Sequence, residues 1–190
     1  LCIKDSKIYL ISDNSDKNSS LSILAKGSYN LSGNEQASLH FGMVNEFSSM
    51  LGSTMDSGFA LAANTKTYFT GASYEAKADS VSFFANYMLG VTEPETVEGS
   101  LIKNMSTLYS SSFALGLSVQ TESKLSEKYG LVISSPLAVT KGKAEIFLPI
   151  SRDDVTDEIS YELINANLAP TSRELDVETF YTVGEANLNL

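Results

Sequence analysis

The 190-residue chain is poor in the residues on which most catalytic and metal sites depend. It holds one cysteine (Cys2), one histidine (His40) and no tryptophan. A single cysteine excludes an intramolecular disulfide, and Cys2 with His40 lacks the spacing of a metal site. Around His40 there is no motif of a Ser-His-Asp triad. We therefore expect no catalytic, cofactor-binding or metal-binding residue, and we interpret His40 as a polar residue within a strand.

Positive charge is scarce as well. Thirteen Lys and Arg stand against 23 Asp and Glu, which gives a net charge of −10. Nucleic acids and anionic lipid headgroups are both bound by clustered Lys and Arg, so neither is an expected partner. No small-molecule substrate is predicted either, because the chain has no phosphate-cradling glycine loop.

Two further segments are missing from the sequence. No positively charged start precedes an apolar run, so we expect no signal peptide in these residues. No run of about 18 apolar residues occurs, which excludes a transmembrane helix. Transmembrane β-strands are still possible, since they alternate in polarity and never show such runs.

What the chain does contain is a residue pattern with a period of two. Between residues 21 and 31, Leu21, Ile23 and Ala25 would share one face, and Ser22 and Lys26 the other. Such alternation is typical of strands, whose successive side chains point to opposite faces. The predicted strands are 7–12, 21–31, 37–43, 58–63, 67–76, 81–91, 113–119, 129–137, 141–150, 159–163 and 167–178. The sequence therefore predicts a single all-β domain over residues 1–190, in about a dozen antiparallel strands.

The segments between these strands are less regular. Residues 45–56 are expected to form a long loop, and Pro94 is expected to end the strand before it, because proline cannot donate to a ladder. Residues 100–109 fit either a strand or a helical turn. Lys141-Gly142-Lys143 is interpreted as a hairpin turn.

Three motifs near the C-terminus carry a family resemblance. They are Gly-Leu-x-x-Ser-x-Pro-Leu from Gly130, Leu-Pro-Ile from Leu148, and Leu-Ala-Pro-Thr-Ser-Arg-Glu-Leu-Asp from Leu168. Together with Ser- and Gly-rich pieces upstream they resemble, over residues 47–183, the C-terminal domain of proteobacterial subtilisin-like serine peptidases. The sequence departs from that pattern at its end, Asn187-Leu-Asn-Leu190, which lacks a terminal aromatic residue.

That resemblance implies an autotransporter-like outer-membrane β-barrel, without catalysis of its own, at the C-terminus of a longer chain. It implies bacterial outer-membrane lipid and a covalently linked N-terminal passenger as partners. An up-and-down barrel also agrees with the low charged fraction of 19%, against about 25% in typical domains. Aromatic residues near predicted strand ends would suit an interfacial girdle. These are Tyr29, Phe47, Tyr68, Tyr109, Tyr129, Tyr161 and Tyr181.

A second interpretation stays open. The chain could be a soluble β-sandwich, secreted or periplasmic, that assists the folding or surface binding of a secreted peptidase. A sandwich would show two sheets packed around a mixed core. A barrel would show an apolar band facing lipid and a seam between its first and last strands.

Two charged features have more than one interpretation. The acidic residues 153–158 could offer oxygen ligands to calcium, but they lack the spacing of a calcium loop, so a solvated hairpin turn is the simpler interpretation. Arg173, next to Glu174 and Asp176, could form an ion pair inside a barrel or lie on the surface.

Overall fold

The computed structural model describes residues 5–14, 19–54, 60–122 and 125–185, and in them the chain is all-β. Long alternating runs form long strands, and the predicted fold class is confirmed. The strands are β1 (Asp5–Asn14), β2 (Ser19–Ser32), β3 (Glu35–Phe47), β4 (Asn64–Ala78), β5 (Val81–Glu95), β6 (Ile102–Met105), β7 (Leu108–Glu122), β8 (Leu125–Lys141), β9 (Lys143–Arg152), β10 (Ile159–Asn167) and β11 (Asp176–Glu185). Cys2 and residues 186–190 lie outside the described residues.

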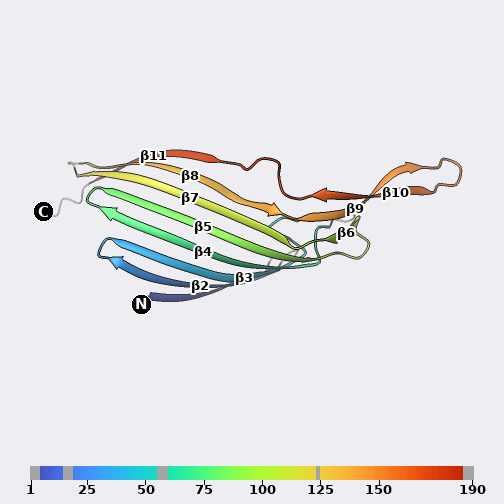
Figure 1. Cartoon of the computed structure of the whole chain (residues 1–190), viewed down its shortest axis with the longest axis horizontal. Helices are drawn as coiled ribbons and strands as arrows, with labels where there is room; N and C mark the ends of the chain where they lie inside the picture. The colour runs from blue at the N-terminus through green and yellow to red at the C-terminus, as the bar shows by residue number, and fades with distance from the viewer. Residues whose placement is uncertain (1–4, 15–18, 55–59, 123–124, 186–190) are drawn as a thin grey trace.

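The strands are arranged in two antiparallel sheets. The large sheet has eight strands in the order β1-β2-β3-β4-β5-β7-β8-β11, and the small sheet has three in the order β10-β9-β6. The small sheet extends from one end of the large sheet, and its β9–β10 hairpin projects farthest (Figure 1). The chain leaves the large sheet twice, once to form β6 and once to form β9 and β10.

Neither predicted architecture is present in full. Among the described strands β1 and β11 each have one neighbour, so the large sheet does not close into a barrel. The two sheets are not stacked face to face as in a sandwich, since the small one continues beyond the end of the large one (Figure 1). The result is an open, eight-stranded antiparallel sheet with a small sheet at one end.

Some predicted local features are wrong. Lys141-Gly142-Lys143 is not a hairpin turn, because β8 and β9 belong to different sheets and do not pair. Residues 60–63 are a loop, and residues 168–175 connect β10 to β11 without being a strand. Ambiguity over residues 100–109 is resolved in favour of two strands, with β6 ending at Met105 and β7 starting at Leu108.

Pro94 does not end its strand either. It lies in β5 opposite Thr65 of β4, whereas the last β5 residue that pairs with β7 is Thr92. Beyond Thr92 the β7 side of β5 is therefore a free edge. A proline is tolerated there because no ladder hydrogen bond is required of it.

The small hydrophobic core lies where the two sheets join. Leu108, at the start of β7, is completely buried (0% exposed) and packs with Ile102 and Met105 of β6 and Ala144 of β9. Met50 and Leu168 contribute partly buried side chains from the adjoining loops. This cluster ties the small sheet to the large one, since it joins β6 and β9 to β7.

Gly142 makes this junction possible. It is buried between β8 and β9, and a Cβ there would collide with the Leu108 side chain. Because Leu108 is the centre of the core, it has no free space into which to move. A side chain at this position would therefore force Leu108 to shift from its place in the core.

We predict that Gly142→Ala lowers the free energy of unfolding by about 1–3 kcal/mol, the usual cost of overpacking a core. The measurement is urea-induced unfolding followed by far-UV circular dichroism. Gly33→Ala is the matched control, because no atom lies within 4 Å of its Cβ position. Equal stability of the two variants would contradict the role assigned to Gly142.

Candidate functional site: the two faces of the large sheet

The strand registers assign two opposite characters to the two faces of the large sheet. Directly paired residues share a face, so each face can be followed from strand to strand. One face, here called the apolar face, carries Ile8, Leu10, Leu21, Ile23, Leu39, Phe41, Tyr68, Tyr74, Phe83, Tyr87, Leu89, Leu115, Leu117, Leu131, Val177 and Tyr181. The predicted separation of residue types is thus confirmed.

The apolar side chains on this face are exposed. Leu10 on β1 is 70% exposed, Phe41 on β3 56% and Val177 on β11 64%. The exposure therefore extends across the whole sheet from one edge to the other. Monomeric soluble proteins rarely expose contiguous apolar patches above a few hundred Å². A face of this extent is expected to meet lipid or another protein.

Tyrosine and charged residues border the apolar face at both ends of the strands. At the end with the β2–β3 turn, the Tyr74 hydroxyl donates to Glu35 at 3.2 Å. At the same end, the Tyr129 and Tyr181 hydroxyls both donate to Glu127, each at 3.1 Å. The Tyr129 and Tyr181 rings, which face each other across β8 and β11, have centroids 4.8 Å apart.

At the other end, Tyr68 and Tyr109 lie in one cross-strand row with Val91 between them. The Lys141 ammonium group lies 5.8 Å from the centre of the Tyr109 ring. Tyrosines with their polar tips near charged groups thus lie at both margins of the apolar face, and their assignment to an interfacial girdle remains a prediction. Tyr161 does not belong to it, because it lies in β10 of the small sheet.

The opposite face, here called the polar face, carries mainly small and polar side chains. Its buried members include Ser28 and Ser38, whose hydroxyls are 3.0 Å apart, and Thr67 and Thr92, also 3.0 Å apart. Other buried polar residues of this face are Glu46, Thr65, Ser110 and Ser118. The hydroxyl side chains of the two bonded pairs are short and hydrogen-bond to each other across strands, so they project little from the sheet.

Three phenylalanines of the polar face lie over glycines. Phe69 is opposite Gly42, Phe84 opposite Gly116 and Phe180 opposite Gly130, and in each pair a Cβ on the glycine would collide with the ring. An aromatic ring that covers a cross-strand glycine shields the backbone and pins the register. The glycines therefore allow the rings to lie flat along the sheet.

His40 lies on the polar face, on the same side as Ser38 and Gly42, as predicted. Its Nε2 is 3.1 Å from the Ser73 hydroxyl oxygen. A catalytic pair would need a carboxylate to orient the imidazole, but the residue paired with His40 on β2 is Lys26. The contact is that of a polar residue satisfied within the sheet, and the absence of catalysis stays a prediction.

Arg173 is exposed, so of the two predicted arrangements the surface position is confirmed, and from there it fastens the β10–β11 connection to the apolar face. Its Nη1 donates to Ser111 Oγ (2.9 Å), its Nη2 to the Ser111 carbonyl (2.6 Å), and its Nε to Ser135 Oγ. The guanidinium also lies 5.6 Å from the centre of the Phe113 ring. Ser135 donates in turn to the Glu174 carbonyl at 2.8 Å. One side chain thus connects β7, β8 and the start of β11.

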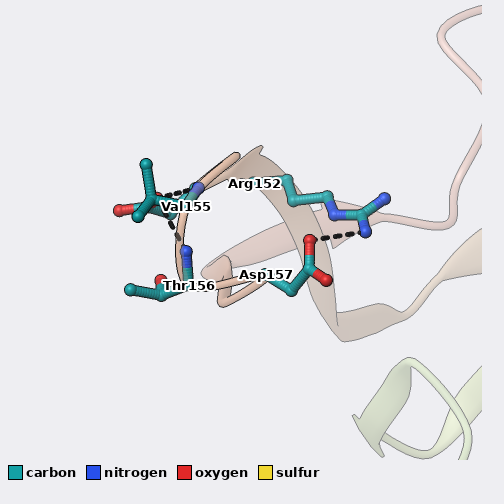
Figure 2. A network of polar contacts seen from close by, with 5 residues as sticks. Arg152, Val155, Thr156 and Asp157 are labelled. Atoms are coloured by element: carbon teal, nitrogen blue, oxygen red, sulfur yellow. Dashed lines mark hydrogen bonds and ion pairs between the residues drawn. The ribbon is translucent and has the colours of Figure 1, made fainter.

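The acidic residues 153–158 form the turn of the β9–β10 hairpin (Figure 2). The Asp153 carboxylate accepts hydrogen bonds from the backbone of Val155 (2.7 Å) and Thr156 (3.1 Å), and Arg152 pairs with Asp157 at 2.7 Å. The Asp153 and Asp157 carboxylates are therefore bonded to residues of the turn and its flanking strand. In the described part of the chain, no group of three or more His, Cys, Asp or Glu is placed to hold a metal ion.

No helix long and apolar enough to span a membrane occurs among the described residues.

We predict that Arg173→Lys destabilises the fold by about 1–3 kcal/mol, because lysine lacks the planar fork with which Arg173 bonds Ser111 and Ser135 together, and hydrogen bonds to charged groups contribute about that much. Denaturant unfolding measures the change, and amide hydrogen exchange locates it in β11. Arg152→Lys is the control, since its exposed ion pair with Asp157 contributes at most about 1 kcal/mol. Equal losses in the two variants would contradict the role of Arg173.

The turn gives a second prediction. Hydrogen bonds from the backbone amides of Val155 and Thr156 lower the pKa of Asp153 below its ordinary value of 3.8. The ionised carboxylate therefore stabilises the turn above pH 3.8, and this contribution is lost as the pH falls through the lowered pKa. We expect the amide resonances of Val155 and Thr156 to titrate with a midpoint below pH 3.8. In Asp153→Asn that titration should vanish, and its persistence would assign it to another group.

No protein-family model matches this chain, and no curated protein or solved structure resembles it significantly. The resemblance to the C-terminal domain of subtilisin-like peptidases therefore remains a prediction. Arg173 belongs to the most specific motif of that resemblance, and it has a structural role because it anchors the connection to the last strand.

Proposed function

We propose that this chain is a membrane-embedded β-domain, an anchor or translocator in the bacterial outer membrane for a passenger that precedes it in a longer chain. The observation that carries the proposal is the exposed apolar face. It crosses all eight strands of the large sheet and has tyrosines at both margins. Transmembrane β-strands have an apolar side toward lipid and a polar side toward the interior in this way.

The length of the strands supports the proposal. β2, β3, β4, β5, β7 and β8 have 14, 13, 15, 15, 15 and 17 residues. A tilted strand needs about 9–11 residues to cross the hydrocarbon core. Charged residues that belong to these strands and lie on the apolar face, such as Lys66, Glu93 and Glu127, are near strand ends. The Arg173 guanidinium is the exception on this face, since it reaches over Phe113 from the β10–β11 connection, where it is bonded to Ser111 and Ser135. Away from Arg173, the central segments can therefore sit in lipid while the charged ends remain in water.

The free edges of β1 and β11 set a condition on this function. Backbone groups facing lipid need hydrogen-bond partners, so both edges must be paired in a membrane. Since eight strands alternate in direction, β1 and β11 run antiparallel and have the right orientation to pair with each other. Eight is also the smallest strand number found in barrels of this kind.

A soluble accessory domain is the competing function, and the exposed apolar face is the observation against it. In water that face would promote association. As a soluble domain the chain would have to cover the face with a partner of comparable width. The membrane proposal needs no such partner protein.

The test is refolding into lipid vesicles, followed by electrophoresis of unheated and boiled samples. A folded transmembrane β-domain should migrate faster before boiling. Tyr87 and Asn86 are neighbours in the middle of β5, both exposed, on the apolar and polar faces respectively. Tyr87→Lys should destabilise the folded chain in lipid by about 2–4 kcal/mol, the cost of lysine at the middle of the membrane. Asn86→Lys should change the stability little.

Two outcomes would overturn the proposal. One is a monodisperse chain in detergent-free buffer whose electrophoretic mobility does not depend on heating. The other is an equal response of Tyr87→Lys and Asn86→Lys in vesicles, since lipid would then not distinguish the two faces.

A further inference from the structure

A small apolar hollow interrupts the polar face near the small sheet. Its volume is about 240 Å³, and its walls include Val44, Phe69, Met88 and Leu137. The buried residues of the polar face are mainly serine and threonine, so a hollow with apolar walls differs from its surroundings.

β8 is irregular beside the hollow. Ser111 pairs with Ala138 but Phe113 pairs with Ser135, so β8 has one extra residue at this point. Leu137, within this bulge, is on the wall of the hollow, and the Ser110 hydroxyl lies over Gly90, where a Cβ would come within 2.5 Å of it. Bulges commonly re-aim side chains.

One polar group of the hollow is left without a partner. Ser110 is 98% buried, and its hydroxyl makes no hydrogen bond within the described structure. The other polar groups are occupied. Thr67 bonds to Thr92, and the Glu46 carboxylate accepts from Ser49 Oγ and from the backbone amides of Leu51 and Gly52. An unpaired buried hydroxyl costs about 1–3 kcal/mol, which a bound ligand would recover.

We propose that this hollow binds a small neutral molecule with one aromatic ring and one hydrogen-bonding substituent, such as a phenol. A cavity of about 150 Å³ accepts benzene, so 240 Å³ has room for a ring with small substituents. The Ser110 hydroxyl would pair with the substituent once a flexible wall side chain moves aside. Glu46 disfavours an anionic ligand. The inference does not depend on the proposed function, because it concerns the opposite face of the sheet.

The test uses fluorine NMR of 4-fluorophenol, 4-fluorotoluene and 4-fluorobenzoate with the refolded full chain, and empty detergent micelles as the reference. We expect 4-fluorophenol to bind best. Ser110→Ala should weaken its binding about 2- to 12-fold, the value of one hydrogen bond, and leave 4-fluorotoluene unchanged. Ser118→Ala is the control, because Ser118 is a buried serine of the same strand outside this hollow.

The expected fold of each variant is verified by its far-UV circular dichroism. Equal binding of 4-fluorophenol by the unaltered chain and Ser110→Ala would overturn the proposal. So would 4-fluorobenzoate or 4-fluorotoluene binding as tightly as the phenol, since neither charge nor the hydroxyl would then be recognised.

Discussion

Backbone hydrogen bonding between long antiparallel strands is the interaction on which the rest of this structure depends. Within the described residues no hydrophobic layer packs against the large sheet, and the fully buried apolar residues gather at one end, around Leu108. The ladder must therefore hold the sheet along most of its length. Cross-strand pairs such as Ser28 with Ser38, and phenylalanines over glycines, reinforce its register.

The same ladder gives the sheet two faces of different polarity. A strand has only two faces, so an apolar residue at every second position leaves the alternate positions for small polar ones. In the arrangement that we propose, the apolar set would face lipid and the polar set would line an interior. A one-residue slip in any register would exchange the two sets, and the flat Phe84–Gly116 and Phe180–Gly130 pairs oppose such a slip.

Sequence alternation alone could predict the all-β class, most strands, and the face on which His40 lies. It could not predict which strands share a sheet, because the sheet change at Gly142 depends on the position of Leu108, more than thirty residues earlier. Arg173 was identified as notable, but its partners Ser111 and Ser135 come from β7 and β8 and have no local signal. The hollow beside Ser110 also escaped prediction, since a bulge shifts Leu137 out of simple alternation.

The excursion through the small sheet has a consequence for the order of assembly. Every other neighbour pair in the large sheet except β3–β4 and β5–β7 joins strands separated by a short connection, whereas β11 pairs with β8 only after the chain has passed through β9 and β10. Pairing of strands distant in sequence requires a costly loop closure and is slow. The edge of β8 therefore stays open longest during folding. A nascent domain would remain able to accept another strand there until the last hairpin has formed.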